Sequence, residues 1–174
     1  MAKSSMETMQ AERRKILQIL EQNAKESVDG IAKKCGFSSQ KVGRIIRQLE
    51  QEHIIWGYSI VMDEKGTELN HYVLLLKRTL VPLDDSMQRE VLDEKLDKYL
   101  PPQVKIEDII LTHGRYDAMI TFYAPGLLIA RKVIESLSQR IGKYFQEYLL
   151  LETLFPIRKQ SLKNPDIKNL TKYI

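Results

Sequence analysis

Apolar residues in the first fifty positions recur at helical spacing in three separate stretches. The first stretch, from about Glu7 to Gln22, carries one apolar stripe, and the next two each follow an i, i+3, i+4, i+7 pattern. The apolar positions are Ile16, Leu17, Ile19 and Leu20, then Val28, Ile31, Ala32 and Cys35, then Val42, Ile45, Ile46 and Leu49. The pattern predicts three amphipathic helices around one small core, with Cys35 packed as a small apolar side chain.

Polar residues mark where the second and third of these helices begin and end. Ser27 is a good N-cap for the second helix, and Gly36 follows its last apolar residue, where a left-handed backbone ends a helix. The third helix begins at Ser38 or Ser39. Two short helices joined by a tight turn are typical of a helix-turn-helix.

The segment from Ile54 to Asp63 is rich in β-branched and aromatic residues and predicts a strand that leaves the third helix. Residues 63–66 then have the composition of a turn. We expect Trp56 and Tyr58 to pack as apolar side chains of this linker strand; stacking on nucleic-acid bases is the alternative.

The hydrophobic period changes after residue 70. Short apolar runs predict strands at Tyr72–Leu76, Ile106–Thr112, Tyr116–Tyr123 and Tyr148–Phe155, with helices at Met87–Leu100 and Pro125–Ile141. The order β-α-β-β-α-β is that of a ferredoxin-like domain, with two helices on one face of a four-stranded antiparallel sheet. The predicted fold class is therefore α+β: an N-terminal helix-turn-helix (winged-helix-like) domain followed by a C-terminal ferredoxin-like βαββαβ domain.

Two of the predicted strands, 72–76 and 148–155, contain unbroken apolar stretches. A sheet that is covered on one face only should alternate apolar and polar residues, so we expect the second face to be buried too. The pattern offers no spare helix to cover it, and a second copy of the chain is the simplest partner, which predicts a homodimer. The expected segments are a DNA-binding head at 1–56, a linker strand and turn at 57–69, the dimerisation domain at 70–156 and a basic tail at 157–174 that is either flexible or packs as an arm.

Charge is unevenly distributed along the chain, whose net charge is +4. Residues 1–62 hold 10 Lys and Arg against 7 Asp and Glu, and residues 157–174 hold 5 against 1. A basic head and tail favour contact with a polyanion, although a solvated surface also tolerates such imbalances. No apolar run reaches the roughly 18 residues of a membrane span, and a single cysteine rules out an internal disulfide, which favours a cytoplasmic location.

The exposed face of the predicted third helix is cationic and rich in amides. Between Gly30 and Leu49 the chain has five Lys or Arg and no Asp or Glu. Arginine can fork onto guanine edges, glutamine onto adenine, and lysine can pair with phosphates, so the face suits double-stranded DNA; a solvated basic face is the alternative. The expected DNA-binding residues are Lys33, Lys34, Ser38, Ser39, Gln40, Lys41, Gly43, Arg44, Arg47 and Gln48.

These motifs resemble the Lrp/AsnC family of transcription regulators, also called leucine-responsive or feast/famine regulators. The resemblance lies in residues 16–27, 31–39 and 42–50, and in the exit Ile54-Ile55-Trp56-Gly57-Tyr58, which is nearly the family's own text. Behind the head, Gly114-Arg115-Tyr116-Asp117 is similar to the family's glycine-x-tyrosine-aspartate turn. The resemblance covers residues 10 to about 157.

The resemblance implies a regulator whose head binds DNA and whose second domain dimerises, with dimers that often join into tetramers or octamers. It also implies that a small-molecule effector, commonly an amino acid, binds at the turn formed by Gly114, Arg115, Tyr116 and Asp117, where Asp117 would suit an α-amino group. The alternative is a plain turn glycine and a capped surface carboxylate. The chain departs from the family at 141–146, where an isoleucine-proline-glycine-valine step is usual, and in its basic tail.

A second interpretation is an enzyme of tetrapyrrole metabolism, because some proteins of this architecture decarboxylate sirohaem. That chemistry needs His and Arg around the tetrapyrrole carboxylates, and the histidines here are His53, His71 and His113. The sequence has no nucleophile set, phosphate loop or metal-ligand spacing, and its cationic head favours DNA. We therefore predict a non-enzyme with no catalytic residues, no metal and no cofactor.

Overall fold

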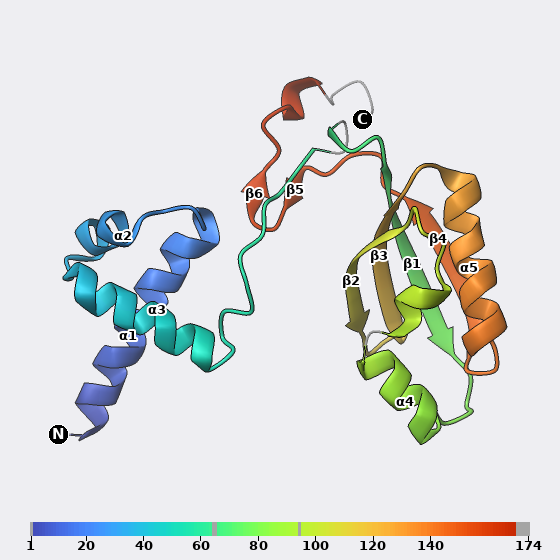
Figure 1. Ribbon diagram of the computed structural model, residues 1–174, viewed down its shortest axis with the longest axis horizontal. Helices are drawn as coiled ribbons and strands as arrows, with labels where there is room; N and C mark the ends of the chain where they lie inside the picture. Colours follow the sequence, from blue (N-terminus) through green and yellow to red (C-terminus); the bar gives the residue numbers. More distant parts are fainter. Residues whose placement is uncertain (1, 64–65, 94, 170–174) are drawn as a thin grey trace. The chain divides into compact units, whose positions relative to one another are not determined.

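The computed structural model describes residues 2–63, 66–93 and 95–169. They fall into two compact units: the head up to Val61 together with the segment from Ile157, and the stretch from Met62 to Pro156. Figure 1 shows the elements of each unit, and the predicted α+β class is confirmed. No helix in the described ranges is long and apolar enough to cross a membrane.

Three helices form the head: α1 (Ala2–Gln22), α2 (Val28–Cys35) and α3 (Ser39–Gln51). α1 begins five residues before the predicted helix, because Ala, Met, Glu and Gln in its first turns are strong helix formers even without an apolar stripe. The apolar faces of the three helices meet in the predicted core, and half-buried Cys35 packs against it. The buried residues are Ile16, Ile31, Ala32, Val42, Ile45 and Leu49.

The turn between α2 and α3 is fixed by the predicted caps. Ser27 Oγ accepts a hydrogen bond from Gly30 N at 3.0 Å, and Ser38 Oγ accepts one from Lys41 N at 3.3 Å. Gly36 ends α2 with a φ of 71°, a conformation that a side chain would strain. These local interactions set the direction in which α3 leaves the turn.

The predicted linker strand over Ile54–Asp63 is absent from the structure, which gives this segment no strand partner among the described residues. β-branched and aromatic residues favour a strand, but a strand forms only beside a neighbour whose backbone groups it can bond. Trp56 is 94% exposed, so the expectation that it packs in the linker is wrong. Of the predicted turn at 63–66, residues 64 and 65 lie outside the described ranges.

The second unit is built on an antiparallel sheet whose strand order is β2-β3-β1-β4. Its four antiparallel strands confirm the predicted ferredoxin-like sheet. The strands are β1 (Asn70–Arg78), β2 (Lys105–Leu111), β3 (Ala118–Ala124) and β4 (Phe145–Glu152). β4 begins three residues before the predicted strand, since Phe145 already pairs with Arg78 of β1. The prediction followed the apolar run and missed the alternating residues that precede it.

The predicted helix Met87–Leu100 is wrong in its length: the structure divides it into α4 (Asp85–Leu92) and the 3-10 helix η2 (Lys95–Tyr99). Asp93 caps the end of α4, and aspartate disfavours helix interiors because its side chain competes for backbone groups. The break leaves Leu92 at the surface and turns Leu96 into the core. Glu94 lies outside the described ranges.

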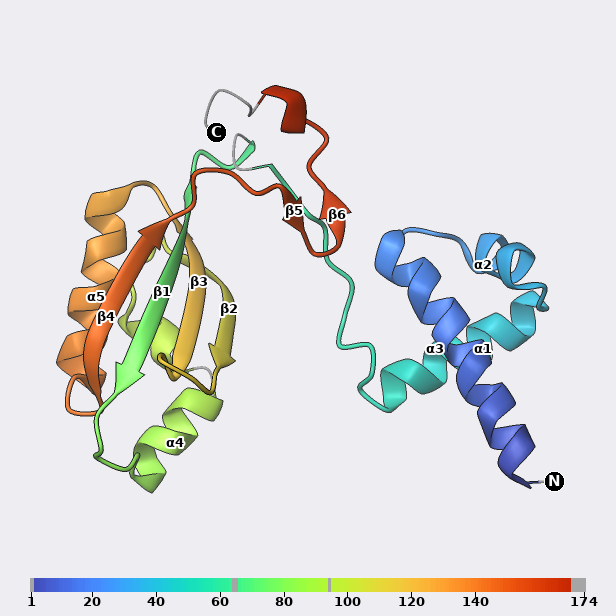
Figure 2. The same ribbon diagram turned by 180° about the vertical axis from the view of Figure 1, so that it is seen from behind.

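One face of the sheet is covered and the other is not. α4, η2 and α5 (Leu127–Ile141) pack on the face that carries Tyr72, Leu74 and Leu76 of β1, and α5 runs along that face in Figures 1 and 2. The opposite face carries Val73 and Leu75, and no described helix of this unit covers it.

The described part of the basic tail forms a small hairpin, β5 (Arg158–Lys159) and β6 (Leu162–Lys163). It belongs to the same compact unit as the head, and its turn residue Ser161 donates a hydrogen bond to Glu21 of α1. The last part of the expected tail, Leu170–Ile174, lies outside the described residues.

Two carboxylates of the second unit accept hydrogen bonds that favour their charged forms. Asp84 accepts from the Tyr144 hydroxyl and, as N-cap of α4, from Met87 N at 2.9 Å, which lowers its pKa to about 2. Glu90 accepts from the Tyr99 hydroxyl at 2.6 Å and from Arg140, which likewise lowers its pKa to about 2. Both values lie below the ordinary carboxyl pKa values of 3.8 and 4.5.

These depressed pKa values predict acid sensitivity of the second unit. A carboxyl whose folded pKa lies below its unfolded pKa stabilises the fold above the unfolded value and loses that effect as the pH falls through the folded value. We therefore expect the melting temperature of this unit to fall between about pH 4.5 and pH 2. Scanning calorimetry should show a smaller fall for Asp84→Asn/Glu90→Gln than for wild type. The exposed pair Asp97→Asn/Glu135→Gln is the control, and equal pH dependence of both variants would contradict the assignment.

Candidate nucleic-acid interface

The exposed face of α3 brings together the predicted base-reading side chains. Gln40, Arg44, Arg47 and Gln48 are all exposed, and their spacing places them on one side of the helix, opposite the buried Val42, Ile45 and Leu49. Gly43 lies beside them, and a β-carbon there would meet no atom within 4 Å. The backbone of α3 is therefore open to close approach on this side.

Among the described residues, two of the predicted lysines, Lys41 and Lys34, form ion pairs. Lys41 Nζ lies 2.5 Å from Glu12 Oε1 of α1 and 4.7 Å from the centre of the Phe37 ring. Lys34 Nζ lies 2.6 Å from Glu26 Oε2, and this hydrogen bond lowers the pKa of Glu26. Lys33 is exposed at the end of α2. The absence of acidic residues between positions 30 and 49 thus misleads, because the partners come from elements outside that window.

The two predicted serines act within the head. Ser38 is the N-cap of α3, and Ser39 Oγ donates a hydrogen bond to the Asp29 carboxylate of α2. Sequence reasoning missed a further contact: Arg13 of α1 forms an ion pair with Glu52, directly after α3. Nothing in the spacing of the sequence signals that pair, since 39 positions separate its members.

The predicted effector residues gather at one end of the sheet. Asp117 Oδ2 accepts a hydrogen bond from Arg78 N at 2.8 Å, at the point where β1 ends. The Tyr116 hydroxyl donates to Glu147 Oε1 at 2.8 Å, which raises the tyrosine pKa, and exposed Arg115 lies over the Tyr116 ring. Asp117 is therefore a backbone-capping carboxylate, which is the structural alternative to a ligand contact, and Gly114 lies in the turn beside it.

The two histidines of the second unit do not converge on one site. His71 lies opposite Tyr123 near the end of β3, with Nε2 at 3.0 Å from Glu107 Oε2. His113 follows β2, beyond the pair formed by Leu111 and Ala118, and so lies at the opposite end of the sheet. His53 is in the head, in the turn after α3. This arrangement does not favour the sirohaem interpretation.

Comparisons with known proteins agree with this architecture. A family model described as winged helix-turn-helix DNA-binding matches residues 13–55. An uncharacterized HTH-type transcriptional regulator, YugG of Bacillus subtilis (strain 168), is 26% identical over 124 residues, which is 71% of this chain and 72% of YugG.

Solved structures share the fold over most of both chains. The crystal structure of an AsnC family transcriptional regulator from Agrobacterium tumefaciens aligns with a TM-score of 0.66 and 20% identity, covering 90% of this chain and 97% of that one. The transcriptional regulator NMB0573 from Neisseria meningitidis, solved as an L-Met complex, aligns with a TM-score of 0.66 and 16% identity, covering 94% and 97%.

The N-cap of α3 gives a direct stability test of this interface. Replacing Ser38 with alanine leaves the first turn of α3 without a side-chain acceptor, and we expect a loss of about 0.5–2 kcal/mol in the unfolding free energy of the head. Gln40→Ala, on the exposed face, should stay within about 0.5 kcal/mol of wild type. Denaturant titration measures both, and indistinguishable midpoints would contradict the capping role.

Proposed function

We propose that this chain, which carries a winged helix-turn-helix on the two-unit fold of the Lrp/AsnC regulators, is a DNA-binding transcription regulator that reads its sites with α3 and acts as a homodimer. The observation that carries the proposal is the exposed face of α3. There, Gln40, Arg44, Arg47 and Gln48 form a surface of forked donors and amides around a helix backbone left open at Gly43.

The paired and unpaired cations have different roles in this proposal. Arg44 and Arg47 are exposed and carry base recognition, while Lys33 at the end of α2 contacts phosphate. Lys41 and Lys34 already have carboxylate partners, so they position α3 and the turn before α2. DNA affinity should therefore depend more on Arg44 and Arg47 than on Lys41 and Lys34, although all four residues are basic.

The uncovered sheet face supports the homodimer. Leu75 of β1 lies between Leu149 of β4 and Met119 of β3 on this face. Ile110, Leu149 and Leu151 remain 42%, 37% and 45% exposed, so the face presents a contiguous apolar surface. Such a surface is typical of an interface, and a two-fold pair buries the same patch on both chains. The two α3 helices of a dimer would then read half-sites one DNA turn, or a multiple of it, apart.

The turn at Gly114–Asp117 is the proposed effector site, for an amino acid or a related small metabolite. NMB0573, which shares the fold, was solved with L-Met. Asp117 offers a carboxylate to an α-amino group, although one of its oxygens already accepts from Arg78 N. A ligand there acts by preferring one assembly state, and a tenfold preference corresponds to about 1.4 kcal/mol of coupling, enough for a graded response.

The DNA proposal is tested with Arg44→Ala/Arg47→Ala. The wild type first selects its site from a random duplex library, and affinities for that site are then compared. We expect Arg44→Ala alone to cost about 1–3 kcal/mol of specific binding if it forks onto a base, and the double variant to lose site preference. Arg131→Ala/Lys132→Ala, which removes the same charge from exposed positions of α5, should bind like wild type. Unchanged affinity of the Arg44→Ala/Arg47→Ala protein would overturn the role of α3.

The dimer proposal is tested on the uncovered sheet face. Leu149→Glu/Leu151→Glu places two charges on half-exposed positions, so the single chain should still fold while the dimer dissociates. Light scattering at micromolar concentration should give the mass of two chains for wild type and of one chain for the variant. Leu80→Glu/Leu128→Glu, at exposed positions off this face, should remain dimeric. A folded wild-type monomer would refute the proposal.

The effector proposal is tested by a thermal-shift panel of amino acids. A ligand at about 100 times its Kd should stabilise the wild type by about 2.7 kcal/mol. Asp117→Asn keeps an oxygen acceptor for Arg78 N but removes the negative charge, and it should lose the response without losing DNA binding. If no compound shifts the wild type, or the variant responds equally, this turn is not an effector site.

A further inference from the structure

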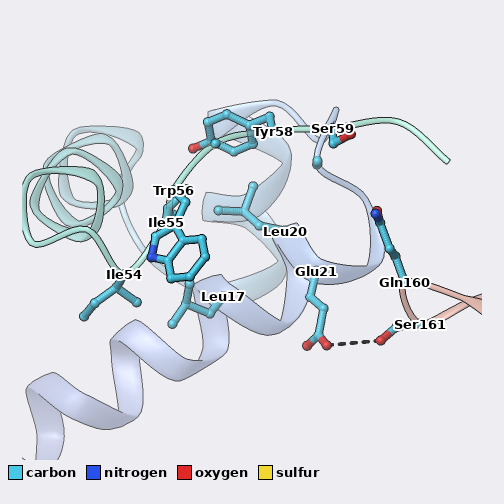
Figure 3. A pocket seen from close by; sticks show the side chains of 12 residues that line it. Leu17, Leu20, Glu21, Ile54, Ile55, Trp56, Tyr58, Ser59, Gln160 and Ser161 are labelled. Carbon is cyan, nitrogen blue, oxygen red and sulfur yellow. Dashed lines mark hydrogen bonds between the residues drawn. The ribbon is translucent and has the colours of Figure 1, made fainter. Parts of the chain in front are cut away.

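The turn of the β5–β6 hairpin contacts the head, although more than a hundred residues separate the two in sequence. Its turn residue Ser161 donates a hydrogen bond to Glu21 Oε1 of α1 at 3.3 Å, as Figure 3 shows. Gln160 and Ser161 also line an open cavity of about 510 Å³ together with Leu17 and Leu20 of α1 and residues 54–59. The turn of the hairpin therefore lies beside the end of α1 and the segment that follows α3.

This hairpin carries features that lower its own stability. Its two turn residues, Gln160 and Ser161, have φ values of 44° and 66°, in the left-handed region where Asn-Gly is preferred. Each strand is only two residues long, and an isolated hairpin is marginal even when longer. Arg158 and Lys163 stand directly opposite each other in the ladder, where like charges repel.

The two opposed cations of the hairpin, Arg158 and Lys163, suit an anionic ligand. Arg158 and Lys163 are both exposed, and Arg158 reaches the Ser161 carbonyl with Nη1 at 3.3 Å. Residues 157–169 hold four Lys or Arg and one Asp. Two cations held side by side are stabilised by a shared anion, and a phosphodiester backbone supplies anions at regular spacing. Local strain kept at such a position indicates a binding role.

The position of the hairpin beside the helix-turn-helix points to DNA phosphates as the anion. The helix-turn-helix match ends at residue 55, and residues 56–63 directly after it form no strand or hairpin, although a winged helix carries its wing at this point. β5–β6 instead packs beside that same segment. We propose that the β5–β6 hairpin is the wing of this head, supplied from the C-terminal segment, and that Arg158 and Lys163 bind phosphates of double-stranded DNA. The inference rests on the proposed function and adds a second DNA contact to it.

The experiment measures the salt dependence of DNA binding for the full chain. Each phosphate contact contributes about 0.9 to the slope of log affinity against log salt, so Arg158→Gln/Lys163→Gln should lower the slope by about 1.8. Between about 50 and 200 mM salt the wild type should then lose about 12-fold more affinity than the variant. The loss should be equal on the selected site and on random duplex, because phosphate contacts carry no sequence information.

Two variants make the outcome decisive. Arg131→Gln/Lys132→Gln removes the same charge from α5, and Arg158→Lys/Lys163→Arg keeps the charge of the hairpin. If both of these variants show the same salt dependence of DNA binding as wild type, while Arg158→Gln/Lys163→Gln shows a smaller one, the result supports the wing. The inference is overturned if Arg158→Gln/Lys163→Gln matches the α5 control, or if the charge-keeping variant loses as much as the glutamine pair. Wild type that binds no duplex, or an Arg44→Ala/Arg47→Ala variant that keeps its site preference, would instead overturn the proposed function.

Discussion

α3 is held against α1 by the buried core that the two helices share and by two ion pairs made by neighbouring residues of α1. Glu12 holds Lys41 near the start of α3, and Arg13 holds Glu52 just after its end. The side chains of Lys41 and Glu12 are 32% and 22% exposed, so this pair is better shielded than an ordinary surface pair, which contributes little. Glu52 of the second pair is 48% exposed, so that pair adds less. With the Ser38 cap fixing the turn, the face opposite the core is held in one direction. A rigid helix is what sequence reading requires, since base contacts demand fixed geometry.

The second unit depends on a different constraint: both faces of its sheet carry apolar residues, but the described helices cover only one of them. α4, η2 and α5 bury Tyr72, Leu74 and Leu76, and a strand that buries alternate residues exposes the ones between them. Val73 and Leu75 of β1 are apolar as well, so the sheet has two apolar faces and helices for only one of them. The core of the head is covered by its own helices, whereas this unit leaves an apolar sheet face uncovered by any described helix, and the proposed dimer rests on that face.

Much of this architecture could be predicted from the sequence, and the failures in the linker and at the lysines share one cause. The helices of the head and their caps at Ser27, Gly36 and Ser38 depend on local spacing, which a sequence displays. The linker strand and the packing of Trp56 depend on a neighbour that the pattern does not contain. The same holds for the candidate site. The helical spacing predicted which residues of α3 are exposed, but it could not predict the ion-pair partners of Lys41 and Lys34, which lie outside α2 and α3. Hydrophobic periodicity predicts which face of an element is apolar, but it does not predict which other element or side chain contacts that element.

The two compact units carry net charges of opposite sign, because the basic tail belongs to the same unit as the head. Residues 1–62 alone have a net charge of +3, and the described tail residues 157–169 add four Lys or Arg against one Asp. The intervening residues 63–156 hold 12 Lys and Arg against 15 Asp and Glu. In chain order these are three alternating blocks of modest charge, but in space they are one basic unit and one acidic unit. A polyanion attracts the first and repels the second, so the electrostatics favour an approach in which the head, and not the second unit, meets DNA.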